Sequence, residues 1–197
     1  MAFSYNQELI NNAFTYGAYR QHLNHELTQP PKDENAEKMR PYTQKNVALM
    51  DQFDTAYQVS DRLKATLQEA PPTIWLVLTE GWCGDAAFNV PLLAAVEKAS
   101  PEKIKLRFLL RDNNLELMDA YLTDGGRSIP KLIVLSADLQ DLGTWGPRPA
   151  GLQNLMQRWK AEGLTLKEII PQVHAWYDAD ATHSAQEELT TLVQSYS

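Results

Sequence analysis

The fold is decided by residues 74–86, which read Ile-Trp-Leu-Val-Leu-Thr-Glu-Gly-Trp-Cys-Gly-Asp-Ala. The apolar run at 74–78 follows two prolines and is typical of a strand that is buried on both faces. A short turn follows, and an apolar pattern with helical spacing begins directly after it. Cys83, the one cysteine of the chain, therefore lies where a buried strand turns into a helix.

The elements that follow this turn predict a mixed sheet. The pattern from residue 73 to residue 160 runs strand, helix, strand, helix, strand, strand, helix. A strand-helix-strand crossover pairs its strands in parallel, and a hairpin adds an antiparallel edge. We therefore expect an α/β fold, a small mixed sheet with helices on both faces. The expected strands lie at 74–78, 104–110, 131–135 and 139–145.

Helical patterns flank this core on both sides. Ser4 and Gln7 fit a capping box for a first helix, which Pro30 and Pro31 interrupt, and a second helix is expected from Thr43. Two more helices are expected near the C-terminus, at 165–177 and 183–195. The N-terminal helices either cover part of the sheet or mediate formation of a homodimer. The expected units are an N-terminal helical extension (1–70), the core (71–160) and a C-terminal helical extension (161–197).

The composition excludes several classes of protein. The 197 residues are 44% hydrophobic, enough for a substantial core, yet no apolar run approaches 18 residues, so no membrane association is expected. The N-terminal residues lack the basic and apolar segments of a secretory signal. The net charge is −7, and no Lys or Arg follows Lys167, so nucleic acid is not an expected partner. His22 and His25 have no third ligand nearby, so neither a metal nor another cofactor is expected. These features indicate a soluble cytoplasmic protein.

The single cysteine limits the redox chemistry and also points to it. One thiol excludes an intrachain disulfide, a Cys-rich zinc site and a self-contained dithiol. A helix N-terminus gathers unpaired amides and the positive end of the helix dipole, which favour a thiolate with a lowered pKa. The alternative is a buried structural cysteine. Trp82 and Gly84, on either side of Cys83, favour a partly exposed turn.

Residues 81–86, Gly-Trp-Cys-Gly-Asp-Ala, resemble the active-site turn of thioredoxin-like proteins. Pro91 lies eight residues after Cys83, where helices of this superfamily commonly carry a proline. Ser128-Ile129-Pro130 stands before an apolar strand, where the superfamily places a cis-proline beside the cysteine. The resemblance covers roughly residues 73–160 and is strongest to a bacterial subgroup with a Trp-Cys-Gly-Asp turn. It implies a thioredoxin-like sheet flanked by helices.

Two departures from the thioredoxin pattern shape the expected function. Ala86 stands in the position of the resolving cysteine, and the thioredoxin proton-relay acid would fall near Val77, which cannot titrate. The resemblance therefore implies monothiol exchange, in which Cys83 attacks a protein disulfide or accepts a low-molecular-weight thiol. An external thiol would then resolve the mixed disulfide. The alternative is a non-enzymatic binding module in which Cys83 is incidental, and a thiol transferase or peroxidase is weaker because no dedicated base neighbours Cys83.

Charged residues near Cys83 are expected to tune the thiol. Asp85 either caps the amides of the helix or raises the pKa of the thiol directly. Arg127 lies three residues before Pro130, in a loop expected to face Cys83, where a guanidinium would favour the thiolate. Arg111, at the end of the second strand, is a weaker candidate, and both arginines are otherwise surface residues.

The remaining candidates would contact a substrate. The resemblance implies that the backbone of Ile129 pairs with an extended substrate beside Pro130, as a short added strand. It also implies that Trp82 shields the sulfur and that Gly84 allows close approach. Trp145 either frames an apolar groove with Trp82 or packs in the interior.

Overall fold

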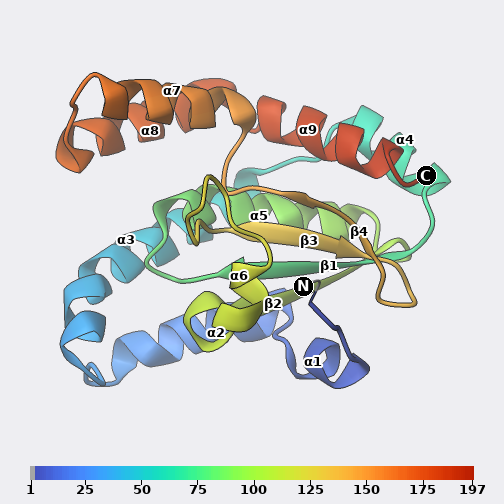
Figure 1. The fold of residues 1–197 in the computed structure, drawn as a ribbon, viewed down its shortest axis with the longest axis horizontal. Helices are drawn as coiled ribbons and strands as arrows, with labels where there is room; N and C mark the ends of the chain where they lie inside the picture. The colour runs from blue at the N-terminus through green and yellow to red at the C-terminus, as the bar shows by residue number, and fades with distance from the viewer. Residues whose placement is uncertain (1–2) are drawn as a thin grey trace.

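The computed structural model describes residues 3–197 and contains a four-stranded mixed sheet (Figure 1). Met1 and Ala2, the start of the expected N-terminal extension, lie outside the described residues. The strand order is β2-β1-β3-β4, with β1 parallel to β2, and β3 antiparallel to both of its neighbours. The expected α/β class and mixed sheet are confirmed. The strands are β1 (Thr73–Thr79), β2 (Ile104–Leu110), β3 (Lys131–Leu135) and β4 (Asp141–Trp145).

The two central strands form the interior of the molecule. All residues of β1 and of β3 are buried, as expected for strands covered on both faces. Strand β2 alternates instead, because Lys105 and Arg107 are partly exposed between buried neighbours. Val77, in the middle of β1, is fully buried among apolar residues.

Helix α5 (Gly84–Ala99) follows β1 and carries the site at its N-terminus. Its residues are mostly apolar and buried, and α3 (Glu34–Ala56) packs along it. Helix α2 (Tyr16–Thr28) packs against α3 and β2. Figure 1 shows α2 and α6 (Leu115–Asp119) on one side of the sheet. The paired helices α7 (Ala150–Ala161) and α8 (Leu166–Asp180), with α9 (His183–Gln194) beyond them, lie along the opposite long side.

The C-terminal helices pack on the core through aromatic and aliphatic side chains. Tyr177 of α8 stacks on Phe88 of α5, with ring centroids 4.2 Å apart. Leu152, Met156 and Ile169 complete this small cluster, which joins α5 to α7 and α8. Helix α9 packs against β4 and against α4 (Asp61–Glu69). None of the helices described for residues 3–197 is both long enough and apolar enough to cross a membrane.

The N-terminal helices differ from the sequence-based expectation. In place of the one expected first helix there are two, α1 (Gln7–Asn12) and α2. Phe14, which lies between them, pairs instead with Phe108 at the outer edge of β2. The cap of α1 is Asn6, not Ser4. Helix α3 begins at Glu34, well before Thr43, because Asp33 caps it with a 2.7 Å hydrogen bond from the N–H of Ala36. The proline within it, Pro41, does not end the helix.

Candidate functional site at the start of helix α5

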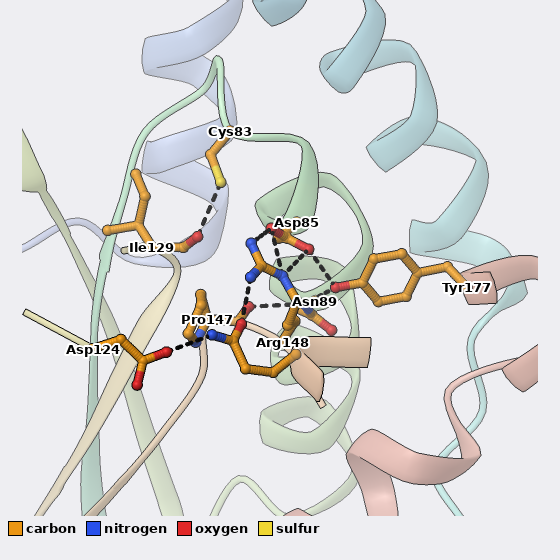
Figure 2. Close-up of polar contacts among 9 residues, drawn as sticks. Cys83, Asp85, Asn89, Asp124, Ile129, Pro147, Arg148 and Tyr177 are labelled. Carbon is orange, nitrogen blue, oxygen red and sulfur yellow. Dashed lines mark hydrogen bonds and ion pairs between the residues drawn. The ribbon is translucent and has the colours of Figure 1, made fainter. Parts of the chain in front are cut away.

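Cys83 is the N-cap residue of α5, the half-helical position at which β1 has just ended. Its Sγ donates a hydrogen bond of 3.1 Å to the carbonyl oxygen of Ile129, as Figure 2 shows. The peptide bond that follows, Ile129–Pro130, is cis. The structure therefore brings Cys83 beside Ile129 and Pro130, although Cys83 and Ile129 are 46 residues apart in sequence.

Burial keeps the Cys83 thiol neutral. Only 7% of the residue is exposed, and burial is the main cause that raises the pKa of the thiol to about 12, with the charge of Asp85 acting in the same direction. The N–H groups of Ala86 and Asp85 at the helix start, and the guanidinium of Arg148, oppose this shift without cancelling it. The turn is partly exposed at Trp82 and exposed at Gly84, as expected, but Cys83 itself is buried, and the lowered thiol pKa expected from the helix start is wrong.

Asp85 forms a nearly buried ion pair with Arg148, which lies in the loop before α7. The Nε atom of Arg148 is 3.1 Å from each carboxylate oxygen, and the side chains of Arg148 and Asp85 are only 13% and 11% exposed. No side-chain hydrogen bond caps the start of α5, so Asp85 does not serve as a helix cap. Of the two roles expected for it, the structure supports the direct effect on the thiol.

A hydrogen-bonded network extends from this ion pair to α8 and α7 (Figure 2). The hydroxyl of Tyr177 donates to Asp85 at 2.8 Å and accepts from Nδ2 of Asn89 at 2.9 Å. On the other side, Arg148 donates to Oε1 of Gln153, whose amide donates to Asp124 at 2.9 Å. This network fixes Asp85 beside Cys83, because every polar group of the ion pair has a partner that is itself held.

Arg127 does not face Cys83. It pairs with Asp119 at 2.6 Å on the surface, and both side chains are about half exposed. Arg148 takes the role that the sequence assigned to Arg127. The deciding feature is the register of the hairpin, which the sequence pattern did not provide: Trp145 pairs with Leu132, and residues 146–148 therefore lie alongside residues 129–131. Tyr177 and Asn89 had no comparable signal in the sequence.

A family model described as Thioredoxin matches residues 32–160, well over half of the chain. This chain belongs to the thioredoxin family. The matched segment contains the whole sheet, Cys83 and the Ile129–Pro130 loop, and it begins early enough to include α3 and α4.

Two solved structures share the fold of this thioredoxin-family chain. A protein of unknown function, PA1234 from Pseudomonas aeruginosa, is 16% identical, with a TM-score of 0.64 over 99% of this chain and 100% of that one. An HIV epitope-scaffold is also 16% identical, with a TM-score of 0.62 over 98% of this chain and 100% of that one. No curated protein matches the chain. At these identities the likeness concerns the fold alone.

The tryptophans of this thioredoxin-family chain have separate roles. Trp82 is partly exposed next to Cys83, and the guanidinium of Arg111 lies over its ring, 4.8 Å from the centroid. Trp145 is buried and donates through its indole N–H to Glu188 at 2.7 Å. The structure therefore agrees with the interior alternative for Trp145, and Arg111 acts on Trp82 rather than on the thiol.

The helix start is sterically open at one residue. A Cβ atom added at Gly84 would meet nothing within 4 Å, so a partner could approach the backbone there without a clash. Ala86, one turn into the helix, is fully buried.

Among residues 3–197, no group of three or more His, Cys, Asp or Glu side chains is arranged to hold a metal ion.

Proposed function

We propose that this thioredoxin-family chain acts in thiol–disulfide exchange through Cys83 alone, and that an external thiol completes the cycle. One observation carries the proposal: the Cys83 thiol lies at the N-terminus of α5 and against the carbonyl group that precedes Pro130. The N–H groups of Ala86 and Asp85 lower the pKa of Cys83, so they would stabilise the thiolate once it forms.

The resting chain would hold Cys83 as a thiol, and substrate binding would start the reaction. An extended substrate that pairs with the backbone of Ile129 would compete for the carbonyl oxygen that now accepts the S–H group. The Cys83 sulfur would then attack one sulfur of the substrate disulfide and form a mixed disulfide with it. The other substrate sulfur would take the proton from Cys83 and leave as a thiol. A second thiol would attack the mixed disulfide, freeing Cys83 as a thiol and leaving the substrate sulfur bonded to the incoming one.

The expected partners follow from this cycle. The substrate would be a protein that contains a disulfide, or a disulfide of a low-molecular-weight thiol. Because one cysteine cannot resolve its own mixed disulfide, the chain requires a pool of reduced thiols, and we propose a cytoplasmic location on that ground.

A coupled assay tests the proposal. Reduction of bis(2-hydroxyethyl) disulfide by glutathione is followed with the wild-type chain and with Cys83→Ser. A rate that depends on chain concentration, and that disappears in Cys83→Ser, supports monothiol exchange. Equal rates for both chains, no faster than glutathione alone, would contradict it.

A second candidate function is a non-enzymatic binding module. It is favoured by the burial that raises the pKa of Cys83 to about 12, because a neutral, covered thiol is inert until something uncovers it. In that case Cys83→Ser would retain every property of the wild-type chain, including the same affinity for a binding partner. The assay above separates the two candidates, because only the exchange protein loses an activity with the thiol.

A further inference from the structure

A cavity of about 390 Å³ lies beside the turn that carries Cys83, on the side of α2 and α3. This volume falls within the usual range for small-molecule sites, roughly 300 to 1,000 Å³. Its walls come from the C-terminal half of α2, the loop at 29–32, the first turns of α3, the turn after β1, and the end of β2 with the segment that follows it. Apolar groups from three of these elements line it, including Met39, Trp82 and Leu110.

Glu80 is the most deeply buried acid in the lining of this cavity. It directly follows β1, three residues before Cys83, and is only 9% exposed. Its Oε1 accepts a hydrogen bond of 2.8 Å from the N–H of Asp112. Within residues 3–197 its carboxylate makes no other hydrogen bond and no ion pair. A nearly buried carboxylate without a second donor is unfavourable, and a ligand that supplies one would relieve that cost.

The other charged groups of the cavity leave an excess of acceptors. Glu26 and Asp112 also line it, so the lining contains three carboxylates with Glu80; Glu26 lies near His22, and Asp112 pairs with Arg111. Arg40, a cation in the lining, already donates to the carbonyl oxygens of Gln29 and Leu27 at the end of α2. Lys32, the other Lys or Arg of the lining, is exposed, and within residues 3–197 no hydrogen bond or ion pair joins it to Glu80. A ligand can therefore supply the second donor for Glu80, and the apolar wall beside the carboxylate favours an alkyl chain behind that donor.

We propose that this cavity binds an organic cation, an ammonium or guanidinium group on an alkyl chain, through the carboxylate of Glu80. The chain packs against Trp82, Met39 and Leu110. A free amine offers this chemistry, and so does a Lys or Arg side chain on a protein that docks beside Cys83. This binding requires no reaction at Cys83, so it stands independently of the exchange activity.

The test uses the full chain, labelled with nitrogen-15, and observes the backbone amide of Asp112, which bonds directly to Glu80. The probes are n-butylammonium, butylguanidinium, 1-butanol and butyrate, together with the peptides acetyl-Gly-Lys-Gly-amide and acetyl-Gly-norleucine-Gly-amide. We expect saturable shifts of the Asp112 amide and the Trp82 indole signal with the cations and with the Lys peptide. Tighter binding of the peptide than of butylammonium assigns the site to a docking protein, and the reverse assigns it to a free amine.

Three variants complete the test. Glu80→Gln keeps the size and the acceptor for Asp112 but removes the charge, and it should weaken cation binding at least tenfold. Ala36→Phe, at a half-buried position of the lining, should fill the cavity and have the same effect even if Glu80→Gln does not fold. Glu116→Gln, an exposed acid outside the lining, should leave binding unchanged. The proposal is overturned if 1-butanol or butyrate binds as well as butylammonium, if no cation binds, or if both cavity variants bind cations as the wild type does.

Discussion

The thiol of Cys83 donates its hydrogen bond to the backbone carbonyl of Ile129, 3.1 Å away, immediately before Pro130. The proposed nucleophile and the backbone group proposed to bind substrate are therefore bonded to each other in the resting chain. Because burial raises the pKa of this thiol to about 12, the resting sulfur is neutral. The arrangement predicts a cysteine that is inert toward simple reagents and that becomes reactive when a substrate takes its place at Ile129.

Alkylation of Cys83 by iodoacetamide at pH 7 should be slow in the native chain. A pKa of about 12, against about 8.5 for a free cysteine, lowers the thiolate population roughly 3,000-fold, and the higher nucleophilicity of the thiolate recovers part of this loss. We expect a native rate on the order of a hundredfold below that of the same chain in denaturing urea. Equal rates in the native and unfolded chains would show that Cys83 is neither shielded nor shifted in pKa.

Replacement of Arg148 should damage the site, whereas replacement of Arg127 should not. Arg148→Met leaves the carboxylate of Asp85 nearly buried and unpaired, which costs about 3 to 5 kcal/mol in the free energy of unfolding. It also leaves the charge of Asp85 unopposed beside Cys83, so the pKa of the thiol should rise further and alkylation should slow. Both quantities are measured by urea denaturation and by alkylation rates.

The matched control is Arg127→Met, which breaks an exposed ion pair with Asp119. Exposed pairs contribute little, so stability and the alkylation rate should remain close to wild type. If the two variants behaved alike, Arg148 would have no special role at the site.

The contrast between these two arginines shows which part of the site the sequence could predict. The strand pattern located β2 and β3 at their observed bounds, because buried and alternating strands have short, regular signals. Proximity in sequence favoured Arg127, but the hairpin places Arg148 beside Ile129 through the pairing of Trp145 with Leu132. The strands were predictable from local pattern, whereas the choice of arginine depended on a register that only the folded hairpin provides.

Burial was the other quantity that the sequence could not supply. The neighbours of Cys83 in the chain, Trp82 and Gly84, suggested exposure, yet Cys83 is covered by groups from distant segments such as Ile129. The pKa of a thiol is set by this three-dimensional environment as well as by the helix terminus. The same limit applies to α3: Pro30 and Pro31 separate α2 from α3 as expected, but the cap at Asp33 places the start of α3 at Glu34 and not at Thr43.

The stability of the chain should depend on pH through Glu80. Burial raises the pKa of this carboxyl from 4.5 to about 7, so the folded chain binds its proton more tightly than the unfolded chain does. The resulting stabilisation is complete below about pH 4.5 and is lost as the pH rises to about 7. Glu80→Gln should remove this loss, so it should be more stable than wild type at pH 8, by a few kcal/mol at most, and little changed at pH 4.5.

Urea denaturation of both chains at pH 4.5 and pH 8 measures this difference. Glu116→Gln, an exposed acid, serves as the control and should show no pH-dependent gain. A Glu80→Gln chain that is less stable than wild type at both pH values would mean that the carboxylate is needed in its ionised form for the fold.

Replacement by alanine should affect the stability of the chain differently at two glycines near the site. A Cβ at Gly146 would lie 2.3 Å from the carbonyl oxygen of Pro130, and the residue has φ +105, so Gly146→Ala should destabilise the chain by about 1 to 3 kcal/mol or more. Gly84→Ala meets nothing within 4 Å and lies in the first turn of α5, so it should be neutral or slightly stabilising.

Gly84→Ala also tests substrate approach. If a partner contacts the backbone at Gly84, Gly84→Ala should slow disulfide exchange while thermal unfolding remains unchanged. An exchange rate equal to that of the wild type would exclude close approach of the substrate at this residue.

The central claim, that Cys83 exchanges disulfides and needs a second molecule to finish, is tested most directly by intact-protein mass spectrometry after incubation with glutathione disulfide. The claim predicts that the wild-type chain gains one glutathionyl group on Cys83 and keeps it after the reagent is removed, until a reduced thiol is added. Ala86→Cys, which supplies a thiol one helical turn away, should lose the group without added thiol. A wild-type chain that never gains the group, as Cys83→Ser never does, would contradict the account.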